Sequence, residues 1–366
     1  MSDQPIVLAA GGTGGHLFPA EALAHVLTAR GVPVELVTDE RAIAFGDSFP
    51  ARAMHIVASA TPRGGSFIAR AQAVASLAYG TAQAAKVLRH LKPRAVIGFG
   101  GYPTVPPLLG AAFLGLPTVI HDANAIMGKA NRFLAPRVDK IAAGFPNLNV
   151  PAPLQNNVFV TGNPVRPNVL EAATMAYPGF EDGAFRLLVT GGSQGARVMA
   201  DIVPEAIAAL PAELRSRLRL VQQTREEDIP RVEAIYKSAG VAVEIAPFFK
   251  NLPQRIAQAH FVISRSGAST VSELAVIGRP SLLVPLPQSL DGDQAANAAV
   301  LKDAGAADVV PQKAFTPAFL TARLVELIGA PHELAGRAEA AKRVGAPDAA
   351  GRLADLILSV AARPAA

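Results

Sequence analysis

One local pattern, a β-strand that runs through a glycine-rich turn into a helix, occurs twice in the chain. An apolar run at 6–10 leads into Gly11-Gly12-Thr13-Gly14-Gly15-His16 and a helical stretch at 17–30. Residues 186–190 lead in the same way into Gly191-Gly192-Ser193-Gln194-Gly195-Ala196. This pattern opens a parallel α/β sheet. Its return halfway along the chain predicts two similar doubly wound domains that face a cleft.

Further segments fit this α/β fold. Apolar runs predict strands at 34–38, 95–98 and 118–121 in the first half, and at 243–246, 261–264 and 281–284 in the second. The turn at 265–270 leads into a helix that ends at Ile277, because Gly278 follows. An alanine-rich stretch at 349–362 predicts a terminal helix.

The domain boundary is predicted from length and from one stiff segment. A chain of 366 residues exceeds what one hydrophobic core supports. Two prolines and a glycine in Gly162-Asn163-Pro164-Val165-Arg166-Pro167 make a non-helical joint. We predict a first domain at 1–163 and a second at 164–344. A helix at about 345–366 can pack back on the first domain, but the pattern alone does not determine on which domain it packs.

Composition excludes several classes of site. There is no cysteine, hence no disulfide framework, no thiolate nucleophile and no cysteine-based zinc site. The net charge of +5 favours anionic partners. Because the basic residues are dispersed and tryptophan is absent, nucleic acid is not expected as a partner. No signal-peptide core or apolar run of about 18 residues occurs, so we expect a cytoplasmic protein without a spanning helix.

Both glycine turns are candidate anion sites. Ligands of open parallel sheets bind beyond the carboxyl ends of the strands, where backbone N–H groups face an anion. A single such turn is as often tight packing, but two at matching positions favour a ligand site. Dinucleotide binding is the alternative, with Asp39-Glu40 in the place of the ribose-binding acid. The third glycine position is Leu17, however, and neither turn has the lysine of a phosphate-binding P-loop.

Two polar groups at the first-half strand ends are candidate catalytic residues. His16 lies where the turn becomes a helix, so the positive helix end favours a neutral imidazole that can act as a general base. His121-Asp122-Ala123-Asn124 adds a carboxylate and an amide to the same sheet edge. A turn-capping histidine and a buried polar cluster without catalytic role explain the same residues, and both alternatives stay open.

The segment 264–273 is a candidate phosphate and ribose site. It places small residues and hydroxyls at a helix start, with Glu273 one turn further, able to accept two sugar hydroxyls. A capping box from Thr270 to Glu273 is the alternative. Asp291-Gly292-Asp293 matches a two-acid metal motif, but so short a match arises often by chance, and we assign no metal.

Six motifs in order resemble the MurG family: Gly11–His16, Gly100-Gly101-Tyr102-Pro103, His121–Asn124, Gly162–Arg166, Gly191–Ala196 and Arg265-Ser266-Gly267-Ala268. The resemblance covers nearly the whole chain and implies the GT-B fold. It also implies inverting transfer of GlcNAc from UDP-GlcNAc to the MurNAc 4-hydroxyl of lipid I, which forms lipid II for peptidoglycan synthesis. No cofactor is implied. The implied location is the cytoplasmic face of the bacterial inner membrane, as a peripheral protein with other cell-wall synthesis proteins as partners.

The resemblance also implies residue roles. The expected general base is His16 or Asp122. The residues that match UDP-GlcNAc contacts are Thr13, Gly14, Gly15, Asn124, Arg166, Ser193, Phe249, Ala268, Ser269, Thr270, Val271, Ser272, Glu273 and Gln294. The acceptor pyrophosphate is expected at Gly14, Gly15, Gly101 and Tyr102. The family usually has His-Glu-Gln-Asn at 121–124, so a role of Asp122 as the acid is less secure than that of Asn124.

Binding to an anionic phospholipid surface is a further hypothesis. Apolar residues flanked by cations suit a bilayer surface, although a buried helix face explains part of the set. The residues are Arg63, Phe67, Ile68, Arg70, Val74, Leu77, Ala78, Tyr79, Lys86 and Arg89. Rival functions are a UDP-GlcNAc 2-epimerase of the same fold, a dehydrogenase and a non-catalytic sugar-nucleotide sensor.

Overall fold

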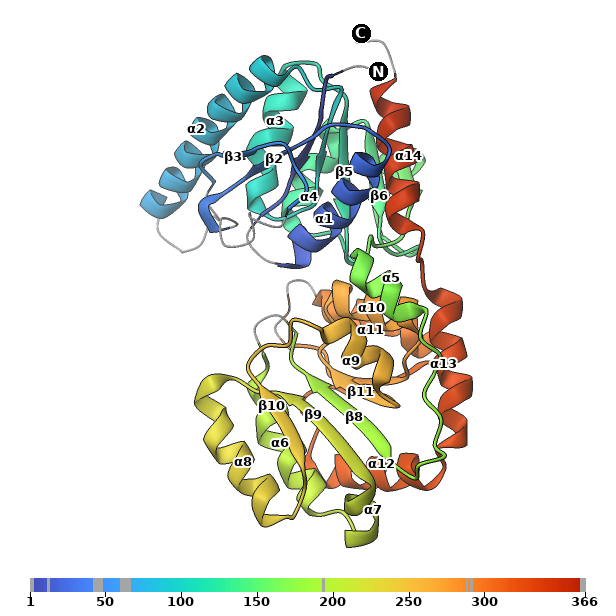
Figure 1. Cartoon of the computed structure of the whole chain (residues 1–366). Helices are drawn as coiled ribbons and strands as arrows, with labels where there is room; N and C mark the ends of the chain where they lie inside the picture. The colour runs from blue at the N-terminus through green and yellow to red at the C-terminus, as the bar shows by residue number, and fades with distance from the viewer. Residues whose placement is uncertain are drawn as a thin grey trace. The chain divides into compact units, whose positions relative to one another are not determined.

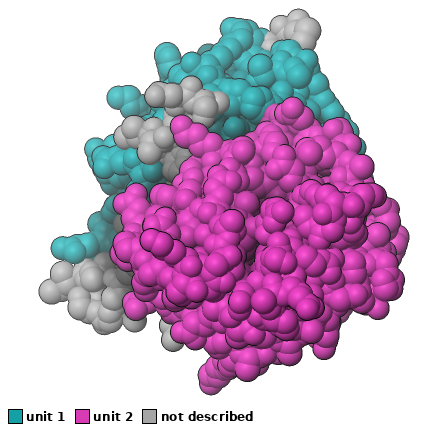
Figure 2. All heavy atoms as spheres, turned by 60° about the horizontal axis from the view of Figure 1, so that its bottom comes forward, with its two compact units in different colours: residues 1–166, 346–366 teal, residues 167–345 magenta. Residues whose placement is uncertain are grey.

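The computed structural model divides into two compact units, Met1–Arg166 with Ala346–Ala366, and Pro167–Gly345 (Figures 1 and 2). It describes residues 3–11, 14–41, 49–59, 67–192, 195–287, 289 and 292–362, and only the backbone of 67–70. Each unit holds one sheet whose strands are all parallel.

The sheet of the first unit has the order β3-β2-β1-β4-β5-β6-β7. Its strands are β1 (Ile6–Ala9), β2 (Val34–Thr38), β3 (Met54–Ile56), β4 (Ala95–Gly98), β5 (Thr118–Asp122), β6 (Lys140–Ala143) and β7 (Val158–Val160). Its helices are α1 (Gly14–Ala29), α2 (Phe67–Leu91), α3 (Val105–Phe113), α4 (Lys129–Leu134) and α14 (Ala349–Ala361). The short 3₁₀ helices are η2 (Tyr102–Thr104), η3 (Ala135–Arg137) and η4 (Ala152–Asn157).

The sheet of the second unit has the order β10-β9-β8-β11-β12-β13. Its strands are β8 (Phe185–Thr190), β9 (Leu218–Gln223), β10 (Val243–Ala246), β11 (Phe261–Ser264), β12 (Ser281–Leu283) and β13 (Ala307–Val309). Its helices are α5 (Pro167–Ala173), α6 (Arg197–Ala208), α7 (Ala212–Arg217), α8 (Ile229–Ser238), α9 (Leu252–Gln258), α10 (Ala268–Ile277), α11 (Asp293–Asp303), α12 (Pro317–Gly329) and α13 (His332–Val344), with 3₁₀ helix η5 (Glu226–Asp228).

The order 3-2-1-4-5-6 occurs in both sheets and is that of a doubly wound dinucleotide-binding fold. The strand order reverses between β1 and β4 in one unit and between β8 and β11 in the other. These switch points are where such sheets bind ligands, and each glycine turn stands at one. The predicted repeat of two similar domains is therefore confirmed.

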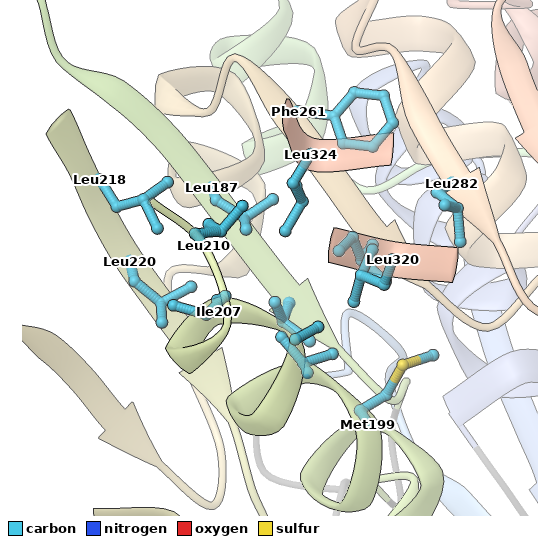
Figure 3. Packing of buried hydrophobic residues seen from close by; sticks show 14 of the residues in the cluster. Leu187, Met199, Ile207, Leu210, Leu218, Leu220, Phe261, Leu282, Leu320 and Leu324 are labelled. Atoms are coloured by element: carbon cyan, nitrogen blue, oxygen red, sulfur yellow. The ribbon is translucent and has the colours of Figure 1, made fainter. Parts of the chain in front are cut away.

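Alternation along the strands explains the layers. In β1, Ile6 and Leu8 pack with α1 and α14 on one face, whereas Val7 and Ala9 pack with α2, α3 and α4 on the other. In the second unit, Leu187 packs with Met199 of α6 and with α12 (Figure 3). Because both faces are covered, the strands read as continuous apolar runs.

The terminal helix α14 belongs to the first unit (Figure 1). Its apolar stripe, Leu353, Ala354, Ile357 and Val360, is buried in the same cluster as α1. Gly162 allows the segment that leads into α14 to pass close to it. Its φ is +83°, and a Cβ there would lie 2.6 Å from the Ala346 Cβ.

Several sequence predictions need correction. Helix α1 begins at Gly14, not at 17, so His16 is in its first turn. Strands β3, β6, β7, β9 and β13 were not predicted, because most are only three or four residues long or carry charged residues. No described helix is long and apolar enough to cross a membrane.

Candidate functional site

In the first unit, three neighbouring strands carry the predicted residues at their carboxyl ends. α1 with His16 follows β1, Gly101 and Tyr102 follow β4, and Asp122 is the last residue of β5. Thr13 lies outside the described residues. The topology thus brings three separate sequence motifs to one edge of the sheet.

His16 is held by the backbone of the loop after β4. Its Nδ1 lies 2.8 Å from the Phe99 carbonyl oxygen, so Nδ1 carries the proton and Nε2 is the acceptor nitrogen. Burial lowers the pKa of His16, and the nearby Arg41 charge adds to this. The neutral imidazole predicted from the helix N-terminus is thus supported, with burial as the main cause.

The glycines after β4 leave room for that imidazole. Gly100 and Gly101 have φ of +86° and +74°, and a Cβ on either would lie 3.2–3.3 Å from the His16 ring. Any side chain here would be strained and would crowd the ring. Tyr102 begins η2 beside them and is partly buried.

His121 is an interior histidine. It is fully buried, its Nε2 lies 3.3 Å from the Gly162 carbonyl oxygen, and its Nδ1 has no hydrogen-bond partner. Burial lowers its pKa to about 4, against the opposing effect of the Gly162 carbonyl. Its role is therefore structural, since it contacts the Phe99 ring at a centroid distance of 5.5 Å.

Asp122 organises the loop that carries Asn124. One carboxylate oxygen accepts the Asn124 N–H at 3.1 Å. The other accepts the Gly128 N–H at 2.9 Å and the Asn131 amide at 3.0 Å. Three donors on one buried carboxylate fix the loop between them.

Arg166 lies against the first helix. Its guanidinium stacks on the Phe18 ring at 3.8 Å from the centroid. The ring also lies close to Gly14, where a Cβ would be 2.9 Å from two Phe18 ring carbons. Gly14 and Gly15 open α1, so Phe18 links the start of this helix to Arg166.

In the second unit, α10 provides an open helix start. Its N-cap is Gly267, with no side-chain hydrogen bond, and Ala268 to Glu273 form the first turns. The capping-box alternative is wrong, because Thr270 lies inside the helix. The Ser272 hydroxyl donates to the Ala268 carbonyl at 2.8 Å. Val271, Ser272 and Glu273 are buried, whereas Ser269 and Thr270 are partly exposed.

Gln294 of α11 lies beside this start. The Ser266 hydroxyl donates to its carbonyl at 2.8 Å, and its side chain accepts the Leu286 N–H at 3.0 Å. Arg265 reaches the same segment, donating to the carbonyls of Val284 and Pro285 at 3.0 and 3.1 Å. The structure thus brings the predicted residues of α10 and Gln294 together.

Phe249 follows β10. In the sheet order, β10 lies on one side of β8, and β11, which leads into α10, lies on the other. Phe249 is buried beneath Arg255, whose guanidinium lies 4.2 Å from the ring centroid. In the turn after β8, Gly192 and Gly195 have φ of +81° and +66°, which favours glycine. Ser193 lies outside the described residues.

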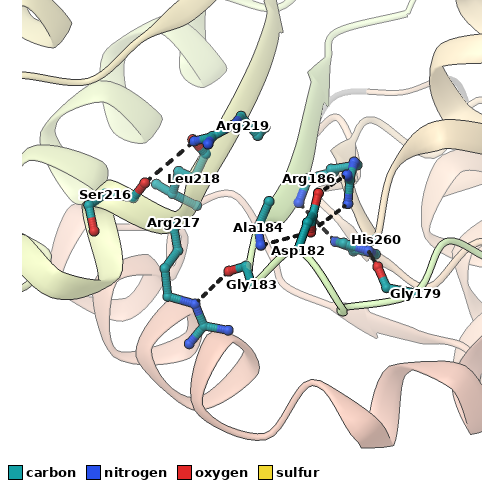
Figure 4. Close-up of polar contacts among 10 residues, drawn as sticks. All are labelled: Gly179, Asp182, Gly183, Ala184, Arg186, Ser216, Arg217, Leu218, Arg219 and His260. Carbon is teal, nitrogen blue, oxygen red and sulfur yellow. Dashed lines mark hydrogen bonds and ion pairs between the residues drawn. The ribbon is translucent and has the colours of Figure 1, made fainter.

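At the amino ends of its strands, the second sheet has a network of structural hydrogen bonds (Figure 4). His260 accepts the Arg186 N–H at Nδ1, at 2.9 Å, and its Nε2 lies 2.9 Å from the Gly179 carbonyl oxygen. Arg217 donates to the Gly183 carbonyl at 2.9 Å. His260 precedes β11, so it lies at the amino ends of the strands, away from the candidate site.

No group of three or more histidine and acidic side chains suited to a metal occurs among the described residues. Asp291, half of the two-acid motif, lies outside them.

Comparison with known proteins decides the family. The family model described as the Glycosyltransferase family 28 N-terminal domain matches residues 6–143, and the C-terminal domain of that family matches 186–353. A protein of Methylobacterium sp. (strain 4-46) is 58% identical over 98% of this chain and 97% of its own. It is named UDP-N-acetylglucosamine--N-acetylmuramyl-(pentapeptide) pyrophosphoryl-undecaprenol N-acetylglucosamine transferase, as is one of Methylobacterium radiotolerans that is 55% identical over 98% of both chains.

The chain belongs to the MurG family. The crystal structure of Acinetobacter baumannii MurG is 28% identical, with a TM-score of 0.78 over 97% of this chain and 99% of that one. These comparisons confirm two expectations: the GT-B fold, and the assignment of the chain as an N-acetylglucosaminyltransferase of the MurG family. A UDP-GlcNAc 2-epimerase from Neisseria meningitidis bound to UDP-GlcNAc has a TM-score of 0.67 over 97% of this chain and all of that one, but is 16% identical, so it shares only the fold.

Sequence reasoning missed three residues that organise this site. Phe18 contacts the expected donor residue Arg166, and Asn131 donates to the candidate base Asp122. Gln223 bonds to the Gly191 turn and to Pro247, which precedes the Phe249 segment. Asn131 and Gln223 are buried polar residues. Asn131 lies in α4, after β5, and Gln223 is the last residue of β9. A search for polar side chains at strand ends would have found Gln223, had β9 been predicted.

Proposed function

We propose that the chain transfers GlcNAc from UDP-GlcNAc to the 4-hydroxyl of MurNAc in lipid I, forming lipid II for peptidoglycan synthesis. Likeness to the Methylobacterium proteins over nearly the full length supports this reaction. The new bond joins the MurNAc oxygen to the anomeric carbon, and the bond from that carbon to the UDP oxygen breaks. Attack opposite the leaving group inverts the anomeric centre, and UDP departs with the electron pair.

His16 is the general base in this proposal. The observation that carries it is the fixed, neutral imidazole: Phe99 holds Nδ1–H, burial keeps the ring neutral, and Nε2 takes the hydroxyl proton. Asp122 already accepts three N–H groups, so we assign it to positioning the Asn124 loop.

The second unit supplies the donor site. The unpaired N–H groups at the start of α10 suit the UDP pyrophosphate, where they stabilise the charge that develops as UDP leaves. Glu273 accepts ribose hydroxyls, Gln294 binds the sugar and Phe249 contacts uracil. The family resemblance also assigns donor contacts to Arg166 and Asn124, and acceptor-pyrophosphate contacts to Gly14, Gly15, Gly101 and Tyr102.

Release of UDP that depends on a lipid I analogue tests the reaction. UDP release without the analogue, or none with it, would contradict the transferase. His16→Ala should lower kcat by about 10²–10⁴ and leave UDP affinity unchanged. His25→Ala is the matched control, because it removes an exposed imidazole from the same helix. Glu273→Ala should instead weaken UDP binding, and unchanged affinity would refute its ribose role.

Peripheral binding to an anionic membrane surface completes the proposal. On α2, Val74 and Tyr79 are 64% and 62% exposed, and Phe113 at the end of the adjoining α3 is 79% exposed. Lys86 and Arg89 of α2 are exposed as well. Leu77 instead packs into the core.

Co-sedimentation with phosphatidylglycerol vesicles at low salt should capture the wild type, and Val74→Ser with Tyr79→Ser should reduce capture. Absence of binding by the wild type would refute this part. Arg63 and the side chains of Phe67, Ile68 and Arg70 lie outside the described residues.

A further inference from the structure

Gln223 ends β9, the strand between two loops of the donor site. β9 lies between β8 and β10, and Gln223 stands opposite Ala246, the last residue of β10. The turn at Gly191 leaves the sheet on one side of it, and the segment Pro247 to Phe249 leaves on the other. Its side chain is therefore placed between the two loops.

The carboxamide of Gln223 bonds to both loops. Its oxygen accepts from the Thr190 hydroxyl at 2.7 Å and from the Gly191 N–H at 3.1 Å. Its nitrogen donates to the Pro247 carbonyl at 3.1 Å. Thr190 extends the contact, because its hydroxyl oxygen accepts the Gly192 N–H at 3.3 Å. Only 6% of Gln223 is exposed, so water competes little for these bonds.

The two loops are held differently elsewhere. The backbone of the glycine turn folds back on itself, because a Cβ at Gly191 would lie 2.1 Å from the Ala196 nitrogen, whereas a Cβ at Gly192 would meet no atom within 4 Å. Phe249 stands two residues after Pro247 and is stacked under Arg255, which Glu244 of β10 pairs at 2.6 Å. A glutamine has both an acceptor and a donor end, so one side chain can hold a loop on each side.

We propose that Gln223 is a positioning residue for the donor nucleotide. It sets the distance between the β8 turn, whose Ser193 is one of the expected donor contacts, and the Phe249 loop, which is proposed to contact uracil. This inference rests on the proposed function, because it assumes that both loops bind one UDP. In this proposal Gln223 acts through the two loops and not by its own contact with the nucleotide.

Calorimetric titration with UDP tests the idea without the transfer reaction. Gln223→Ala should raise the Kd for UDP about tenfold, since three bonds that fix two loops are lost. Gln223→Glu keeps an acceptor for Thr190 and Gly191 but places a carboxylate oxygen against the Pro247 carbonyl. It should therefore reduce the preference for UDP over CDP, and raise KM for UDP-GlcNAc more than it changes kcat.

Gln222→Ala is the matched control. Gln222 is the preceding residue, is fully buried, and its oxygen accepts the Tyr236 hydroxyl hydrogen bond. Successive strand residues face opposite sides. This variant should lower Tm as Gln223→Ala does, yet bind UDP within about twofold of wild type.

Two results would overturn the inference alone: wild-type UDP affinity in both Gln223 variants, or equal weakening by Gln222→Ala. A wild-type chain that bound no UDP would overturn the proposed donor site along with it.

Discussion

The buried neutral His121 should make the first unit sensitive to mild acid. The unfolded chain binds a proton at this histidine below its ordinary pKa of 6.5, whereas the native state does so only near 4. Stability from this group is therefore complete above pH 6.5 and is lost as pH falls toward 4. Between pH 7 and pH 5 the loss is about 2 kcal/mol, because stability falls by about 1.4 kcal/mol per pH unit only below pH 6.5, where the unfolded chain binds the proton.

Urea unfolding followed by circular dichroism at pH 7, 6 and 5 measures this loss. His121→Gln is the informative variant, because its amide can still donate to the Gly162 carbonyl but does not titrate. His16 and His260 also have lowered pKa values and add their own pH dependence, so the comparison is wild type against variant. The variant should lose about 2 kcal/mol less than wild type over this interval. An equal loss in both proteins would refute the reasoning.

The remaining predictions concern three other residues. Because burial keeps the pKa of His16 below 6.5, kcat/KM should be flat from pH 8 to 6.5 and fall only at lower pH, and an acidic limb centred above 6.5 would contradict this. Gly101→Ala should cost about 1–2 kcal/mol of stability for its positive φ and also lower kcat by crowding His16, whereas Gly115→Ala, with φ +66° and no atom near its Cβ, should cost stability only. Arg279→Met should destabilise the second unit by about 3 kcal/mol or more, because the fully buried guanidinium donates hydrogen bonds to the Ala257 and Ile277 carbonyls, among others. An unchanged midpoint of urea unfolding would show that these carbonyls find other donors.

The sequence predicted the central strands more reliably than the edges. β1, β4 and β11 are buried at every residue, and β8 at every residue except Arg186, so their sequences are mostly apolar. The edge strand β7 is short and carries exposed residues, and its apolar pattern is correspondingly weak.

Candidate residues were easier to find than their roles. Glycine turns, His16 and Glu273 stand out because their spacing relative to strands and helix starts is local information. Whether Asp122 acts as a base or as a loop anchor depends on Gly128 and Asn131, several residues away in sequence. The same applies to Thr270, whose capping role failed because the helix begins three residues earlier, after Gly267.

The sequence by itself determined that the chain has two doubly wound domains, each with a glycine turn at its switch point, because strand periodicity and turn chemistry are local properties. Only the tertiary structure decided which distant groups meet: Phe99 with His16, Phe18 with Arg166, and Gln223 with the loops on either side of β9. These contacts join residues from different strands and helices. Their hydrogen bonds and stacking depend on sheet order and burial, which no spacing in the chain encodes directly.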